Sequence, residues 1–291
     1  MAKRALLIGI NKYQIEGADL RGCVNDVANI ERALTKYFAF PAAAIKKLVD
    51  AQATKKKIEV GIKALLKGAK AGDVLFLHYS GHGANTPDLN GDEGDFRDEI
   101  LCPTDLDWKD PLTDDWLRST IDEMLPEKVN LTIVMDCCHS GSNTRNLLPP
   151  DAPIVNRFLP NPYVLAEVES GRSLHGPFRH ARAIGKPKDK AKGKTKSRSG
   201  SLDIAVAEMP EVLFTGCRDY QTSADAYIGG NYNGALTYHL VAAIQTRKGK
   251  LTYRELHEVA SKLINEAKYD QVPQLEGRND NLDRQFLGAL S

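Results

Sequence analysis

Two short polar motifs, each directly after an apolar run, supply a histidine and a pair of cysteines. His82 stands in the motif YSGHG, and Cys137 and Cys138 stand in the motif DCCHSG. The preceding runs, 73–77 and 129–135, have the length and the β-branched or aromatic content of buried strands. In an open parallel sheet, residues just past the carboxyl ends of neighbouring strands meet in one crevice, where ligands bind. The pattern therefore predicts a thiol nucleophile with histidine as its general base.

Each of these residues also has a structural interpretation. Histidines are common in turns, and free cysteines are commonly buried and inert. Two glycines beside His82, however, let a backbone approach closely and expose an N–H group for an oxyanion. His139 follows Cys138 directly, and neighbouring residues at a strand exit tend to point apart, so His82 is the better base. Cys137 remains a competing nucleophile.

The same residue types could hold zinc. Enough ligand atoms are present on His78, His82, Cys137, Cys138 and His139. The motifs lack a C-x₂-C pair, and strand alternation puts His78 and His82 in different surroundings. The sequence therefore favours a reaction that requires no metal or cofactor.

Composition narrows the class of function. A chain of 291 residues can bury a sizeable core, and 39 Lys+Arg against 38 Asp+Glu gives no electrostatic case for nucleic acid or membrane partners. No apolar stretch approaches the ~20 residues that span a bilayer, and the apolar run 5–10 is too short for a signal peptide. Five cysteines without framework spacing indicate a cytoplasmic location.

Strand-like and helix-like segments alternate over the first 140 residues and resume after residue 210. This alternation predicts an α/β fold, with a mostly parallel sheet of about six strands and helices on both faces. Regular structure is expected to fade from Thr144 to about Leu202, and the rear part is expected to hold one strong strand. The expected strands are 5–10, 45–49, 73–79, 99–102, 129–136 and 211–217, and the expected helices are 25–38, 54–66, 113–125, 235–246 and 252–268.

A basic tract interrupts this pattern. Residues 186–200 carry seven basic side chains against one acidic and no large apolar side chain, so we expect a flexible segment. The chain thus divides into a large front part (1–184), a basic linker (185–203) and a small rear part (204–291), which together make one domain. A lysine-rich tract could bind nucleic acid, but it lacks interleaved aromatic side chains.

The two motifs together resemble those of the metacaspases, caspase-like cysteine peptidases of clan CD. The segments RGCVND (21–26), 215–225 and NGA (233–235) also match the family in order and spacing. The resemblance covers most of the chain. It implies a three-layer caspase-like sandwich with a p20-like front part and a p10-like rear part, of the bacterial type without a prodomain.

The resemblance assigns the catalytic roles. Cys138 matches the nucleophile and His82 the base, so the implied activity is a cysteine endopeptidase with a Cys-His dyad. The backbone N–H groups of Gly83 and Cys138 would hold the oxyanion.

The resemblance also implies a specificity pocket. Asp26 and Asp136 match its acidic floor, with Cys23 and Ser80 lining it. Two carboxylates select a cationic side chain, so cleavage is expected after Arg or Lys. A helix cap and a strand-end carboxylate are the structural alternatives for the two aspartates.

An acidic stretch follows the first motif. Residues 88–115 hold eleven carboxylates against two cations, which is also typical of a solvated loop. Many metacaspases require calcium, and Asp98, Asp114 and Asp115 match the aspartates that bind it. A further family aspartate falls on or near Arg145, where a cation would weaken the site. We therefore expect weak activation by calcium.

In the family, cleavage between the two parts follows basic residues. Arg182, Lys196 and Arg198 are the candidates, cut by the enzyme itself or by an activating protease. The expected partners are protein or peptide substrates with a basic residue before the cut bond, and the expected state is a monomer. The rival interpretations are a catalytically silent regulatory scaffold and another clan CD peptidase, such as a legumain-like or separase-like enzyme.

Overall fold

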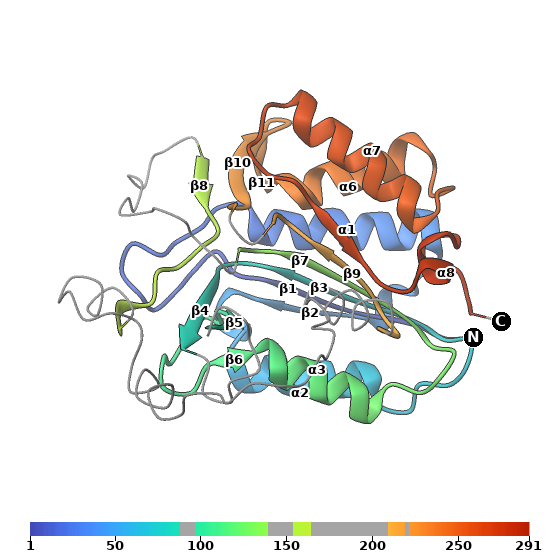
Figure 1. Ribbon diagram of the computed structural model, residues 1–291, viewed down its shortest axis with the longest axis horizontal. Coiled ribbons are helices and arrows are strands. Elements are labelled where there is room, and N and C mark those ends of the chain that lie inside the picture. The colour runs from blue at the N-terminus through green and yellow to red at the C-terminus, as the bar shows by residue number, and fades with distance from the viewer. Residues whose placement is uncertain (88–96, 139–153, 164–208, 219–220, 291) are drawn as a thin grey trace, which may run out of the picture.

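A six-stranded sheet crosses the centre of the molecule (Figure 1). The computed structural model describes residues 1–87, 97–138, 154–163, 209–218 and 221–290. The sheet strands are β1 (Lys3–Gly9), β2 (Ile45–Val49), β3 (Val74–Ser80), β7 (Asn130–Asp136), β9 (Val212–Thr215) and β12 (Gln274–Glu276). Their order is β12-β9-β7-β3-β1-β2, and all neighbours are parallel except β12 and β9. The predicted α/β fold with a mostly parallel sheet of about six strands is confirmed.

Helices cover both faces of this sheet. One layer holds α1 (Cys23–Phe38), α6 (Ala235–Thr246), α7 (Tyr253–Glu266) and the short α8 (Asn279–Leu282), and the other holds α2 (Lys55–Leu66) and α3 (Asp114–Met124) (Figure 1). Every residue of β3 and of β7 is buried, because each strand lies between two layers. Two short 3₁₀ turns, η1 (Ala42–Ala44) and η2 (Asp50–Gln52), flank β2.

Side-chain caps explain where three of the helices begin. The hydroxyl of Thr54 accepts a hydrogen bond from the N–H of Lys57, and that of Thr113 accepts one from Trp116. Thr252 and Glu255 form a capping box at the start of α7. The expected helix 113–125 therefore has its first residue, Thr113, as the cap of α3.

Two three-stranded sheets lie beyond the carboxyl ends of the central strands. They consist of β4 (Gly83–Pro87), β5 (Arg97–Leu101) and β6 (Leu112–Thr113), and of β8 (Ile154–Asn156), β10 (Ala224–Ile228) and β11 (Asn231–Gly234). The expectation that regular structure fades from Thr144 is wrong at β8. The rear part was expected to hold one strong strand; β9 is that strand, and the expectation missed β10, β11 and β12. These strands are three to five residues long, too short for a clear periodic signal. β8 and β12 pair with strands that are distant in the chain, whereas β10 and β11 form a hairpin through Gly229 and Gly230.

The front and rear parts of the chain share one sheet and one core. β9 lies between β7 and β12, and α6 packs against α1. The predicted linker falls within 164–208, outside the described residues. Within the described part of the chain, no helix is both long and apolar enough to cross a membrane.

Candidate functional site

The two motifs emerge side by side at one end of the central sheet. β3 and β7 are in register there, with Ser80 opposite Asp136. His82 and Cys138 each follow two residues beyond these strand ends. Next to them, the main-chain N–H groups of Gly83 and Cys138 meet the main chain of Arg157, a residue that the sequence did not single out.

The main chain of Arg157 is held on both sides of its Cα. Its carbonyl oxygen accepts hydrogen bonds from the N–H of Gly83 at 3.0 Å and from the N–H of Cys138 at 3.2 Å. Its own N–H donates to the carbonyl of Ser223 at 3.0 Å. Gly83 and Cys138, the two predicted oxyanion donors, thus converge on one carbonyl oxygen.

The side chain of Arg157 is completely buried among three carboxylates. Nη2 lies 2.8 Å from Oδ2 of Asp26 and 3.0 Å from Oδ1 of Asp225, while Nη1 lies 3.3 Å from Oδ1 of Asp136. Nη1 also donates to Oγ of Ser80 at 2.8 Å. The predicted pocket residues Asp26, Asp136 and Ser80 therefore surround a guanidinium, with Asp225 added.

Hydrogen bonds from the rear part of the chain fix two of these carboxylates. Asp136 accepts from Ser223 Oγ at 2.6 Å and from Thr237 N and Oγ1 at 2.8 and 2.7 Å. Asp26, in the first turn of α1, accepts from the N–H of Gly234 at 3.0 Å. A side chain at Gly234 would collide with the Arg157 guanidinium and the Asp136 carboxylate, which explains a glycine at the start of α6.

The carboxyl groups differ in how easily they ionise. Burial raises the pKa of Asp26 from its ordinary value of 3.8 to about 7, although Arg157 opposes the rise. Burial would also raise the pKa of Asp136, but Arg157 and the donors Ser223 and Thr237 hold it below its ordinary value. The carboxylates in turn raise the pKa of Arg157 well above its ordinary value despite its burial. The pocket therefore stabilises one side chain that keeps its positive charge at all physiological pH values.

His82 is oriented as a proton acceptor. Its Nε2 lies 2.8 Å from the carbonyl oxygen of Ala18, which requires the proton on Nε2 and leaves Nδ1 with its lone pair. Among the residues the structure describes, Nδ1 has no hydrogen-bond partner. Burial lowers the pKa of His82 to about 4, so the ring is neutral at physiological pH. Tyr13 fixes the backbone by a hydrogen bond from the His82 N–H to its hydroxyl at 2.8 Å.

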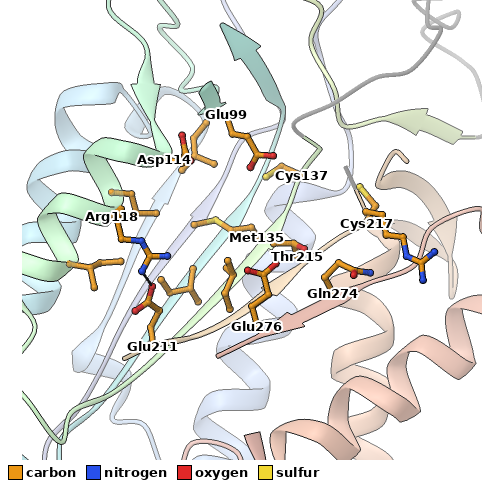
Figure 2. Close-up of a pocket in the computed structure, with 16 residues that line it drawn as sticks. Glu99, Asp114, Arg118, Met135, Cys137, Glu211, Thr215, Cys217, Gln274 and Glu276 are labelled. Carbon is orange, nitrogen blue, oxygen red and sulfur yellow. Dashed lines mark hydrogen bonds and ion pairs between the residues drawn. The ribbon is translucent and has the colours of Figure 1, made fainter. Parts of the chain in front are cut away.

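The two adjacent thiols face different parts of the molecule. Cys138 Sγ accepts a hydrogen bond from the N–H of Ser223, beside the Arg157 main chain. Cys137 lines a separate cavity of about 280 Å³ between α3 and the sheet, beside Glu99 (Figure 2). Burial raises the pKa of both thiols well above the ordinary value. Cys138 is the thiol next to the two predicted oxyanion donors.

The cavity around Cys137 is distinct from the crevice that holds Arg157. Its lining includes Met135 from β7, Thr215 from β9 and an ion pair between Arg118 and Glu211 at 2.5 Å (Figure 2). Hydrophobic side chains of the core between the sheet and α2 and α3 continue into it. The described residues that line this cavity do not include His82, Gly83 or Cys138.

The other predicted site residues fall into three groups. Cys23 is fully buried at the start of α1, next to the charged cluster, and its burial raises the pKa of its thiol. His78 is buried in β3, where Nε2 lies 3.1 Å from Thr237 Oγ1. The residues His139, Arg145, Arg182, Lys196 and Arg198 lie outside the described residues.

The predicted calcium ligands lie at the edge of the first small sheet. Asp98 is in β5, and Asp114 and Asp115 form the first turn of α3. Across 1–87, 97–138 and the later described segments, no group of three or more His, Cys, Asp or Glu side chains is arranged to hold a metal ion. These three aspartates alone do not form a metal site.

The sequence did not identify Arg157, Asp225 or Ser223 as site residues. Asp225 stands between Ala224 and Ala226. A charged residue between small apolar residues is the one feature of the sequence that could have indicated a buried carboxylate there. Arg157 follows Ile154, Val155 and Asn156 and precedes Phe158. This pattern is a weak strand signal and by itself indicates no chemistry. The contacts of these residues join segments 68 to 131 positions apart.

Comparisons of the sequence with known proteins lead to one family, the metacaspases. The sequence model of the metacaspase peptidase C14 domain matches residues 3–145. The chain is 34% identical over 310 residues to Metacaspase-1A of Aspergillus oryzae, covering 99% of this chain and 71% of that protein. It is 34% identical over 293 residues to Metacaspase-1 of Coccidioides immitis, covering 94% of this chain and 61% of that protein.

A solved structure supports the fold. The crystal structure of a Geobacter sulfurreducens protein superimposes with a TM-score of 0.67 over the full length of both chains, at 23% identity. At this level of identity, the similarity concerns the architecture alone.

Proposed function

Because the chain belongs to the metacaspase family of cysteine peptidases, we propose that it hydrolyses peptide bonds on the carboxyl side of arginine or lysine. One observation carries the proposal. A buried arginine fills a pocket of three carboxylates while its carbonyl oxygen lies between two N–H donors beside Cys138. A substrate arginine in the same position would present its carbonyl carbon to the thiol.

In the proposed reaction, His82 Nδ1 takes the proton of the Cys138 thiol as sulfur attacks the carbonyl carbon. The N–H groups of Gly83 and Cys138 stabilise the oxyanion. His82 returns the proton to the departing amine, which leaves a thioester on Cys138. Water then hydrolyses the thioester and restores the thiol.

Pocket chemistry supports the preference for a basic residue. The guanidinium of Arg157 meets carboxylates on two sides, and Ser80 accepts a further hydrogen bond. A neutral asparagine or an acidic side chain would leave these buried carboxylates without a cation, which is strongly unfavourable. Lysine, a point charge on a longer stem, fits with fewer hydrogen bonds.

A panel of fluorogenic peptides with Arg, Lys, Asn or Asp before the cut bond tests the proposal. We expect hydrolysis of the Arg and Lys peptides and loss of at least ~10³-fold in rate for Cys138→Ala. Cys137→Ala is the matched control, since Cys137 lies in the other cavity. An inactive Cys137→Ala beside an active Cys138→Ala would reverse the assignment, and no hydrolysis by folded wild type would favour a silent scaffold.

Calcium enters the proposal as an activator, with no part in the bond-breaking steps. The acidic stretch that contains Asp98, Asp114 and Asp115 supports this role. Asp114 and Asp115 begin α3. The panel is therefore run with calcium and with chelator. Equal rates in both would reject calcium activation.

A further inference from the structure

The segment Ile154–Phe158 lies across the candidate site as an added strand. β8 pairs with β10 in antiparallel register, Asn156 opposite Ala224 and Ile154 opposite Ala226. Asn156 Oδ1 also accepts a hydrogen bond from Thr222 Oγ1 at 3.1 Å. Adding a strand to an exposed sheet edge is a general way of binding an extended peptide.

Both sides of one peptide bond in this segment are held. Before the bond, the carbonyl oxygen of Arg157 lies between the N–H groups of Gly83 and Cys138, and its side chain fills the pocket. After the bond, the N–H of Leu159 donates to the carbonyl of Gly83 at 2.9 Å. The peptide bond between Arg157 and Phe158 is thereby held beside Cys138, whose N–H binds the carbonyl oxygen of Arg157.

We propose that the segment Ile154–Phe158 is a built-in substrate, which closes the site in the intact chain and is cut between Arg157 and Phe158 by Cys138 of the same molecule. The proposal rests on the function proposed above. It adds a specific processing bond and an inhibited starting state.

The main-chain contacts distinguish this role from simple charge neutralisation. An arginine that only neutralised Asp26, Asp136 and Asp225 would need its guanidinium in the pocket. The position of its carbonyl group would not matter. Here the carbonyl oxygen is bound by the two N–H groups that the reaction requires. The complete burial of Arg157 also keeps a second protease from this bond, so cleavage is intramolecular.

The step balances with water as the only reactant. The Cys138 thiol proton passes to His82 Nδ1, the bond from sulfur to the Arg157 carbonyl carbon forms, and the bond to the Phe158 nitrogen breaks. The proton moves from His82 to the new amine of Phe158. Water then cleaves the thioester, giving the Arg157 carboxylate and the free thiol.

Intact mass and amino-terminal sequencing of the purified full-length chain test the proposal. We expect a fragment that begins at Phe158, formed with a first-order rate constant that is unchanged over a tenfold range of protein concentration. Cys138→Ala should stay intact. Arg157→Lys should still be cut, and Arg157→Gln should not.

Phe158→Pro is the decisive variant, because it replaces the peptide bond after Arg157 by an arginine–proline bond, which should resist cleavage, while it keeps the Arg157 cation. It should fold, remain uncut at this bond, and hydrolyse an arginine peptide at least ~10-fold more slowly than cut wild type, because its pocket stays filled. Arg254→Gln, which changes an exposed arginine on α7, is the matched control and should be cut normally.

The outcomes separate this proposal from the proposed function. Hydrolysis of arginine peptides by a chain that never yields the Phe158 terminus, or is cut only at other basic residues, overturns the built-in substrate alone. Failure of every peptide and of self-cleavage overturns both. A rate constant that rises in proportion to protein concentration overturns the intramolecular step.

Discussion

At the scale of single residues, the buried cluster around Arg157 holds more carboxyl groups than cations. One guanidinium meets the carboxyl groups of Asp26, Asp136 and Asp225, all of them fully buried. Unpaired buried charges are strongly unfavourable, so one of the carboxyl groups must take up a proton more easily. The raised pKa of Asp26, about 7, meets this requirement.

This leads to a pH-dependent difference in stability between wild type and Asp26→Asn. From about pH 4 to pH 7, Asp26 is protonated in the folded protein and ionised in the unfolded chain. The folded state then binds the extra proton, so its stability falls as pH rises, by at most about 1.4 kcal/mol per pH unit. The asparagine variant lacks this slope and should gain in Tm relative to wild type from pH 5 to 7, then hold steady above pH 7.

Thermal melts of the two proteins at pH 5, 6, 7 and 8 check this prediction. Taking the difference cancels the titration of all other groups that are unaffected by the substitution. A Tm difference that is the same at pH 5 and pH 8 would show that Asp26 titrates near its ordinary pKa.

At the scale of elements, helix caps fix where several helices start, independently of the site. The α7 helix begins with Thr252, whose hydroxyl accepts from the N–H of Glu255 at 3.1 Å, while the Glu255 carboxylate accepts from the N–H of Thr252 at 2.8 Å. Both interactions satisfy backbone groups that no helical partner can reach.

Thr252→Ala should therefore destabilise the protein by about 1 kcal/mol and lower Tm by about 2–4 °C. Thr246→Ala is the matched control: its hydroxyl binds the carbonyl of Ala242 within α6, and it caps no helix start. The control should change stability by less than about 0.5 kcal/mol. Equal losses in both variants, measured by denaturant unfolding, would contradict the capping argument.

Strand addition is the second feature at this scale. β8 has three residues and gains its partners from β10, some 70 positions later in the chain. A free peptide that extends before a basic residue would pair with β10 in the same way. If the proposal holds, the same edge of β10 binds the built-in segment and a substrate from outside.

At the scale of the whole molecule, the front and rear parts are interleaved. β9 lies between β7 and β12, and the buried cluster around α1, α6 and α7 draws side chains from both parts, including Phe76 and Phe214. Asp26 and Asp136 of the front part are hydrogen-bonded by Gly234 and Thr237 of the rear part.

A chain cut anywhere between Tyr163 and Met209 should therefore stay assembled. The two fragments should elute together at the position of the uncut protein in size-exclusion chromatography and separate only in concentrated denaturant. Uncut protein is the control. Separation of the fragments in native buffer would mean that the shared sheet and core do not hold the two fragments together.

The sequence by itself determined the local structure and the chemistry of the motifs. Apolar runs and capping residues predicted the central strands and the helices, because burial on two faces and helix capping leave local periodic signals. The spacing of His82 and Cys138 after neighbouring strands predicted a common crevice, and the resemblance to the family implied that Asp26 and Asp136 line its pocket.

Only the tertiary structure decided what fills that pocket. Arg157 meets Asp26 across 131 positions and Asp225 across 68, and β8 exists because β10 pairs with it. A buried cation is stable only where several distant carboxylates converge, and no local pattern of residues records such convergence. The predicted processing residues were chosen from a segment rich in basic residues, whereas Arg157, which occupies the site, has no basic residue next to it in the sequence.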